Sequence, residues 1–173
     1  NACAMGPDSS AYGVEAFTQK YAERAYAYGT ASYSEGVDAS AYGTNSQVTG
    51  TNSTAFGTDS LARSENSMAY GLKSKVGTDS PNSAAYGVQA YAKGPNAFAF
   101  GTDAVADGRN VVAIGVGAKA LGYNTNVIAM GTNAFADGSG VMAIGERANA
   151  QSVYSIAVGF NAHATARNAV SIG

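Results

Sequence analysis

The residues of this chain that could perform chemistry are few and scattered. There is one histidine, His163, and one cysteine, Cys3. A metal site needs several ligands and a Ser/His/Asp triad needs a positioned base, so we expect His163 to be a solvated surface residue. One cysteine cannot form an intramolecular disulfide, and the position of Cys3 in the repeat described below is that of a packing residue. The sequence therefore predicts no catalytic residue, no metal site and no cofactor.

Other motifs that could bind or react have simpler structural interpretations. The glycine-rich run GVGAKALG at Gly115–Gly122 lacks the spacing of a nucleotide-binding loop, and no helix is predicted after it. Asp107-Gly108 and Asp137-Gly138 are typical turn formers, not paired catalytic carboxylates. Asn52-Ser53-Thr54 matches a glycosylation acceptor, but its asparagine is a turn residue of the repeat. We predict that the protein is not an enzyme.

The composition argues against an ordinary globular core. The chain has 173 residues, 22 glycines and no tryptophan, and its 46% hydrophobic content comes largely from alanine. Because alanine buries little area, one thick core would gain little transfer free energy. The net charge of −2 and the pI near 5.2 argue against a nucleic acid or an anionic membrane surface as partner.

Glycines recur along the whole chain at nearly constant intervals. Each ends an Ala-x-Gly triplet, or Ser-x-Gly in the last copy, and they are Gly6, Gly13, Gly29, Gly43, Gly57, Gly71, Gly87, Gly101, Gly115, Gly131, Gly145, Gly159 and Gly173. After a first interval of 7 residues, every interval is 14 or 16 residues. Helices are a poor explanation, because glycine inside a helix costs about 1 kcal/mol relative to alanine.

Within each unit the side chains alternate in size with a period of two, which is typical of strands. Alanine stands two residues before the glycine in twelve of thirteen copies, whereas larger residues usually stand one and three before it. The two-residue insertions keep this alternation, since a one-residue slip would exchange the faces. The second half of the unit repeats the small face, as at Ser60 and Ala62, and Asn or Gly marks the bends. The sequence predicts an all-β, two-sided parallel β-roll, or solenoid, of about twelve 14-residue coils with a narrow lumen.

The large side chains should form a continuous apolar stripe along one outer face. Burying about two dozen of them is worth tens of kcal/mol per chain as an upper bound, and the stripe exceeds what a soluble monomer exposes. We therefore predict a parallel homo-oligomer with the stripe on its symmetry axis, a dimer or a trimer. The predicted interface residues are Tyr12, Tyr28, Tyr42, Phe56, Met68, Tyr70, Tyr86, Phe98, Phe100, Val112, Ile114, Ile128, Met130, Met142, Ile144, Ile156 and Val158.

The repeat resembles a known family. The units NSTAFGTDSLA, NSMAYGLKSKV, NAFAFGTDAVA and NVVAIGVGAKA are similar to the NSVAIG-x-x-S repeat of YadA-like heads, found in trimeric autotransporter adhesins of Gram-negative bacteria. The resemblance covers essentially all 173 residues. It implies a left-handed parallel β-roll, a parallel homotrimer, a coiled-coil stalk and an outer-membrane barrel as anchor. One departure is the residue before the glycine, which is Tyr or Phe in most copies up to Phe100 and predicts a wider or hydroxyl-bearing axis there.

With the stalk and the anchor absent, we expect residues 1–173 to be a single head domain excised from a longer protein. The resemblance implies display on the extracellular side of the bacterial surface, with membrane attachment only through the absent C-terminal anchor. The predicted function is attachment of a bacterium to host matrix, host cells or other bacteria. Candidate ligand contacts lie on the other outer face: Phe17, Tyr33, Leu61, Tyr91, Phe135 and His163. The four aromatic residues among them are not expected to form one contiguous patch.

Two other functions are considered. A non-adhesive structural or ice-binding solenoid would present a flat ladder of identical residues, and a threonine ladder just after the glycine is only partial, at Thr30, Thr44, Thr58, Thr102 and Thr132. A solenoid enzyme of the acyltransferase kind predicts a six-residue period and a catalytic histidine in a cleft, and the sequence has neither.

Overall fold

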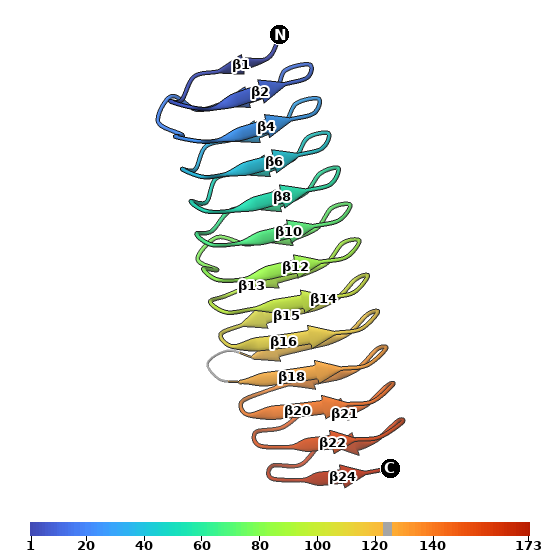
Figure 1. Ribbon diagram of the computed structural model, residues 1–173. Coiled ribbons are helices and arrows are strands. Elements are labelled where there is room, and N and C mark those ends of the chain that lie inside the picture. The colour runs from blue at the N-terminus through green and yellow to red at the C-terminus, as the bar shows by residue number, and fades with distance from the viewer. Residues whose placement is uncertain (123–125) are drawn as a thin grey trace.

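The computed structural model describes residues 1–122 and 126–173, and it shows a rod of stacked coils (Figure 1). The strands alternate between two sheets of 12 strands each. Sheet A contains β1 (Cys3–Ala4), β3 (Phe17–Thr18), β5 (Tyr33–Ser34), β7 (Gln47–Val48), β9 (Leu61–Ala62), β11 (Lys75–Val76), β13 (Tyr91–Lys93), β15 (Val105–Gly108), β17 (Lys119–Gly122), β19 (Phe135–Asp137), β21 (Asn149–Ala150) and β23 (His163–Ala164). Sheet B contains β2 (Ser10–Tyr12), β4 (Tyr26–Tyr28), β6 (Ser40–Tyr42), β8 (Thr54–Phe56), β10 (Met68–Tyr70), β12 (Ala84–Tyr86), β14 (Phe98–Phe100), β16 (Val111–Ile114), β18 (Val127–Met130), β20 (Val141–Ile144), β22 (Ile156–Val158) and β24 (Val170–Ile172).

Neighbouring strands of each sheet are parallel and lie one coil apart. In Figure 1 the strands of sheet B cross the front from left to right while the chain descends and returns behind, so the roll is left-handed. Ala41 pairs with Ala55 at the 14-residue period, and Ala69 pairs with Ala85 across a two-residue insertion. The insertions therefore lengthen the connections and leave the inward and outward positions unchanged. The predicted all-β parallel roll of about twelve coils is confirmed.

Small side chains fill the lumen between the two sheets. Ala55 and Ala62 have no exposed surface, and Ser53 and Ser60 are also buried. The hydroxyl Oγ of Ser53 donates to the backbone oxygen of Ser64 at 2.7 Å, which satisfies a polar group that would be costly to bury unpaired. The narrow lumen predicted from the small positions of the repeat is thus confirmed, and the bulky side chains are left on the outside.

Among the described residues, left-handed backbone angles recur at two bends of the coil. One bend is the predicted asparagine position, as at Asn52 with φ of 52°. The side chains of this row also bond from coil to coil: Nδ2 of Asn52 donates to Oδ1 of Asn66 at 3.3 Å. The other bend lies two residues after the glycine and includes Ala31, with φ of 53°, and Asn45, with φ of 55°. This second bend was not predicted as left-handed.

Replacing Ala31 by asparagine is expected to stabilise the protein. Alanine has no polar side chain to support a left-handed backbone, and such angles cost an ordinary L-residue about 1–2 kcal/mol, whereas asparagine adopts them more readily. We expect Ala31→Asn to raise the free energy of unfolding by up to about 1 kcal/mol, and Asn45→Ala in the next coil to lower it by a similar amount. Urea denaturation followed by circular dichroism measures both changes. A destabilised Ala31→Asn protein would contradict this account of the second bend.

The structure corrects the prediction for Cys3. Cys3 lies in β1 of sheet A, pairs with Phe17 and is exposed, so it is not a packing residue. The repeat pattern groups Gly6 with the glycines that follow the strands of sheet B, but Gly6 follows β1 of sheet A. Cys3 therefore occupies an outward position in the first coil, where no preceding coil covers it. In the part of the chain that the structure describes, no helix is long and apolar enough to cross a membrane.

Candidate functional site

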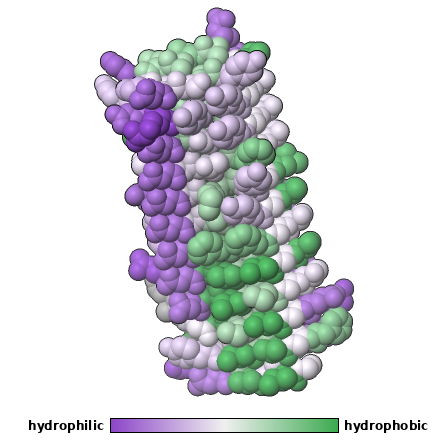
Figure 2. Space-filling view, viewed as in Figure 1, coloured by the Kyte–Doolittle hydropathy of each residue, from purple (hydrophilic) through white to green (hydrophobic). Residues whose placement is uncertain are grey.

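The outer face of sheet B carries all the predicted interface residues in two parallel rows, which we call the apolar stripe. The stripe is the front face in Figure 2, where green apolar side chains dominate its lower half. Its members protrude from strands whose alanines point into the lumen. In the single chain, Tyr70 remains 45% exposed and Met130 40% exposed, although neither lies at an end of the rod. A large apolar surface thus runs along the whole roll.

Aromatic rings stack on one another through the N-terminal part of the apolar stripe. The ring centroids are 5.4 Å apart between Tyr28 and Tyr42, and 4.6 Å apart between Phe56 and Tyr70. These distances match favourable aromatic packing and follow from the strand spacing of about 4.8 Å. The ladder ends at Phe100, and Ile114 continues the same row. The change from aromatic to aliphatic residues divides the stripe into a paler half and a greener half in Figure 2.

The sequence prediction missed some members of this face. Tyr26, Val170 and Ile172 occupy the same two rows, and all three are exposed. The repeat itself contained the signal, because Tyr26 and Val170 stand three residues before a repeat glycine and Ile172 stands one before. The row just after the glycine also carries exposed apolar side chains, which interrupt the threonine ladder: Val14, Leu72, Val88, Val116 and Phe160. A flat ice-binding ladder of threonines is therefore not formed.

The outer face of sheet A holds the six candidate ligand contacts. The structure places them in one row, which we call the ligand row: Phe17, Tyr33, Gln47, Leu61, Lys75, Tyr91, Val105, Lys119, Phe135, Asn149 and His163. The expectation that the four aromatic candidates lack a common patch is thus wrong in part: they share a row, but polar residues separate most of them. The sequence already indicated this shared row, since each of the six candidates is the fourth residue after a repeat glycine.

A small aromatic pair lies near the N-terminal end of the ligand row, directly after Cys3, which pairs with Phe17. The rings of Phe17 and Tyr33 stack with centroids 5.9 Å apart. The hydroxyl of Tyr33 accepts from Nε2 of Gln19 at 2.7 Å and donates to a carboxylate oxygen of Glu35 at 3.2 Å. Partial burial is the main cause that raises the pKa of Tyr33. Tyr33 is thus held in place by its neighbours.

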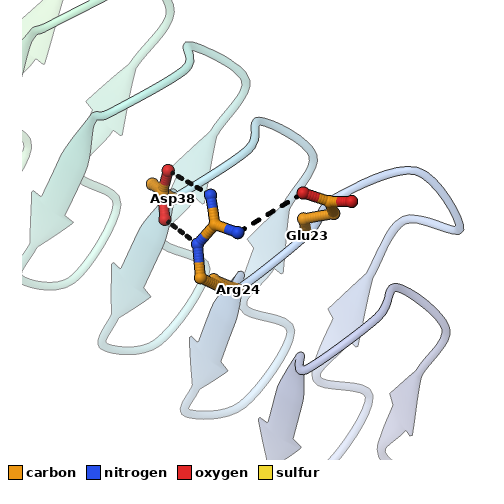
Figure 3. A network of polar contacts seen from close by, with 3 residues as sticks. All are labelled: Glu23, Arg24 and Asp38. Carbon is orange, nitrogen blue, oxygen red and sulfur yellow. Dashed lines mark hydrogen bonds and ion pairs between the residues drawn. The ribbon is translucent and has the colours of Figure 1, made fainter.

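One ion-pair network lies on the bend between the sheets (Figure 3). Nε and Nη2 of Arg24 donate to the two carboxylate oxygens of Asp38 at 2.6 and 2.9 Å, and Nη1 approaches Glu23 at 3.4 Å. Arg24 and Asp38 occupy the bend position at which later coils carry hydrogen-bonded asparagines, such as Asn52 and Asn66. A charged pair therefore replaces an amide pair there. The hydrogen bond from Arg24 lowers the pKa of Asp38.

Asp38 is expected to titrate below the ordinary aspartate pKa of about 3.9. Because the folded-state pKa is the lower one, the pair stabilises the fold above the unfolded pKa and loses this effect as pH falls through the folded value. The carboxyl carbon of Asp38 in an NMR titration reports the midpoint. In Arg24→Gln the midpoint should return toward the ordinary value. An unchanged midpoint in that variant would show that the pair does not form in solution.

No metal-ion site is found among the described residues. No three His, Cys, Asp or Glu side chains in residues 1–122 and 126–173 are placed to hold a metal ion. His163 lies exposed in the ligand row, paired along the sheet with Asn149. What the structure offers is two long outward faces of different character, one apolar and one mixed.

A roll of short repeats with such faces is a parallel β-solenoid repeat protein. The family model described as YadA head domain repeat (2 copies) matches residues 49–74, 81–104, 92–118, 106–125, 128–148 and 150–173. These matches cover more than half of the chain, and the chain belongs to this family of YadA-like head domains. Such heads are adhesin domains of the cell surface and are in general not enzymes, so the chain has an adhesin-type function.

Similarity to individual proteins is more distant. No curated protein matches the chain. Among solved structures, the crystal structure of the collagen-binding domain of the Yersinia adhesin YadA is 25% identical. The similarity covers 95% of this chain and 70% of that one, with a TM-score of 0.42.

Proposed function

We propose that the chain is the head of a trimeric surface adhesin that attaches a bacterium to host matrix, host cells or other bacteria without catalysis. The observation that carries the proposal is the exposed apolar stripe on sheet B. Membership in the YadA-like head family supports three copies and a position at the outer surface of an outer-membrane-anchored protein. The surfaces that remain exposed in the trimer would then bind the target.

The apolar stripe needs a partner surface. Monomers in water rarely expose more than a few hundred Å² of contiguous apolar surface, and this stripe runs over twelve coils. Phe56 and Tyr70 are 44% and 45% exposed, so each stands to gain about 1 kcal/mol on full burial. Summed along the rod, this is enough to hold parallel chains together if their stripes face a common axis.

The ligand row lies on the sheet opposite the apolar stripe. In a trimer closed by sheet B, the three copies of this row face outward and repeat around the rod. Many weak contacts of the same kind then act together, because binding at one copy raises the effective concentration at the others. This arrangement suits attachment to a repetitive or crowded surface.

Two measurements test the proposal. Light scattering should give a mass three times the 17.4 kDa of one chain, and a stable monomer would contradict the role of the apolar stripe. Beads coated with the trimer should attach to matrix proteins, cultured cells or bacteria more than uncoated beads do. A stable trimer that attaches to none of these surfaces would overturn the adhesive function while leaving the assembly intact.

A further inference from the structure

The outer face of sheet A contains a basic groove in an otherwise acidic protein. The groove has a volume of about 590 Å³ and spans the coils of β9, β11 and β13. Four of the ten basic residues of the chain line it: Arg63, Lys73, Lys75 and Lys93. The remaining chain has six basic and all twelve acidic residues, so this clustering runs against the net charge.

The groove is formed by three neighbouring rows on three successive coils. Lys75 pairs with Leu61 on one side and with Tyr91 on the other, all in the ligand row. Arg63 and Lys93 lie in the row two residues further on, and Lys73 lies in the row two residues before. The other three cations thus lie around Lys75 and Tyr91 within about 10 Å along the rod, at about 4.8 Å per coil.

A glycine opens the centre of this array. Gly77 lies between Arg63 and Lys93 in their row, where it provides no side chain. An added Cβ at Gly77 would meet its nearest atom, Oγ of Ser80, at 3.4 Å, and the backbone there is not left-handed. The backbone therefore does not require glycine at this position. The missing side chain creates the hollow.

Most of the positive charge in the groove is free for a ligand. In the described ranges, Lys93 pairs with Asp107 at 3.4 Å, but none of the other three groove cations is in an ion pair. The carboxylate facing this region from the preceding coil, Asp59, accepts a hydrogen bond from Nδ2 of Asn45 at 2.7 Å. Asp59 also lines an adjoining hollow with Arg63, Lys73 and Lys75, but it forms no ion pair with them. Three cations without an ion pair around a hollow favour an anionic ligand with several charged groups.

We propose that the basic groove binds a linear polysaccharide bearing sulfate or carboxylate groups. This ligand class rests on the proposed adhesin function and specifies one surface for it. Arg63, Lys73 and Lys75 would bind the anionic groups, and the partly exposed ring of Tyr91 would offer an apolar surface for the C–H face of a sugar. The amide of Gln89 and the hydroxyl of Thr78, which also line the groove, match sugar hydroxyls.

An acidic peptide fits the groove less well. Peptides that bind in extended form usually add a strand at a free sheet edge, and β11 is paired on both sides by β9 and β13. Peptide binding otherwise depends on apolar pockets, and the groove has only Leu61 and Tyr91 as large nonpolar surfaces, both partly exposed. A polar chain with regularly spaced charges suits the array better.

The test is direct binding of a heparin tetrasaccharide to the assembled protein by calorimetry. We expect affinity that falls as salt rises, because the groove is exposed and its charges are screened. Arg63→Gln with Lys75→Gln should weaken binding about tenfold. Gly77→Gln should weaken it by a similar factor without changing charge, because the new side chain fills the hollow. Glutamine already occupies this row at Gln19 and Gln151, so the variant should fold.

Lys119→Gln is the matched control. Lys119 lies in the ligand row outside the groove, so its loss should change affinity less than about twofold. Equal weakening by Lys119→Gln would show diffuse charge attraction and overturn the proposal. So would hexaglutamate binding as tightly as the tetrasaccharide, or full affinity in the Gly77→Gln protein. Mass and bead attachment, measured on the same preparations, distinguish the two proposals. A trimer that attaches to surfaces but does not bind the tetrasaccharide would overturn the proposed polysaccharide binding and leave the adhesive function standing.

Discussion

Tyr70→Asp is expected to abolish assembly of the proposed trimer. Tyr70 lies in the middle of the apolar stripe, stacked on Phe56 at 4.6 Å and on Tyr86 at 5.6 Å between ring centroids. In a parallel trimer the substitution would place three carboxylates around one axis, away from water and from counter-charges. Removing each charge from water costs several kcal/mol, which corresponds to a loss of at least about a thousandfold in the association constant. Light scattering at micromolar concentration should show monomers or irregular aggregates.

Gln47→Asp is the matched control for this experiment. It introduces the same charge in a strand of similar depth along the rod, but on the outward side of sheet A. We expect its mass and its circular dichroism to equal those of the unchanged protein. Tyr70→Phe should also assemble, since the ring stack persists. If Tyr70→Asp and Gln47→Asp assemble equally well, the apolar stripe is not the interface.

Much of this fold could be predicted from the alternation of inward and outward positions in the repeat. Since every coil has the same two-residue alternation, one inward alanine such as Ala55 fixes the direction of its neighbours in all coils. Insertions of two residues do not disturb this, as the pairing of Ala69 with Ala85 shows. For the same reason the ligand row could have been found by counting four residues from each glycine. The handedness of the roll came from the family resemblance, because alternation alone does not distinguish left from right.

Other features could not be predicted from the pattern. The second left-handed bend carries Asn, Asp or Gly in several coils but also residues as different as Glu15, Lys73 and Gln89, so its composition signal is weaker than that of the asparagine bend. The basic groove depends on side chains from three rows and three coils, which are adjacent only after the coils stack. Gly77 in particular resembles the other glycines of the sequence. Only its surroundings show that its role differs from theirs.

Gly57→Ala is expected to destabilise the fold strongly. Gly57 has φ of 133°, and an added Cβ would lie 2.5 Å from the backbone oxygen and 2.7 Å from the backbone carbon of Gly71 in the next coil. Both atoms belong to the backbone, so no side-chain movement relieves the clash. We expect a loss of about 3 kcal/mol or more in the free energy of unfolding. Because each coil is stabilised by its neighbours, hydrogen exchange should increase in the coils on both sides of Gly57.

Gly77→Ala provides the comparison within the same chain. Its Cβ meets ordinary van der Waals distances, 3.4 Å to Oγ of Ser80 and 3.5 Å to Cγ of Lys93. We expect stability that is unchanged or higher by up to about 1 kcal/mol, because alanine restricts the unfolded chain. Urea unfolding at equal protein concentration compares the two variants, since assembly makes stability concentration-dependent. Equal losses for both would mean that close coil stacking governs Gly77 as well. A stable Gly77→Ala protein would show that folding does not require glycine at position 77. Effects of substitutions at Gly77 on ligand binding could then be attributed to the hollow.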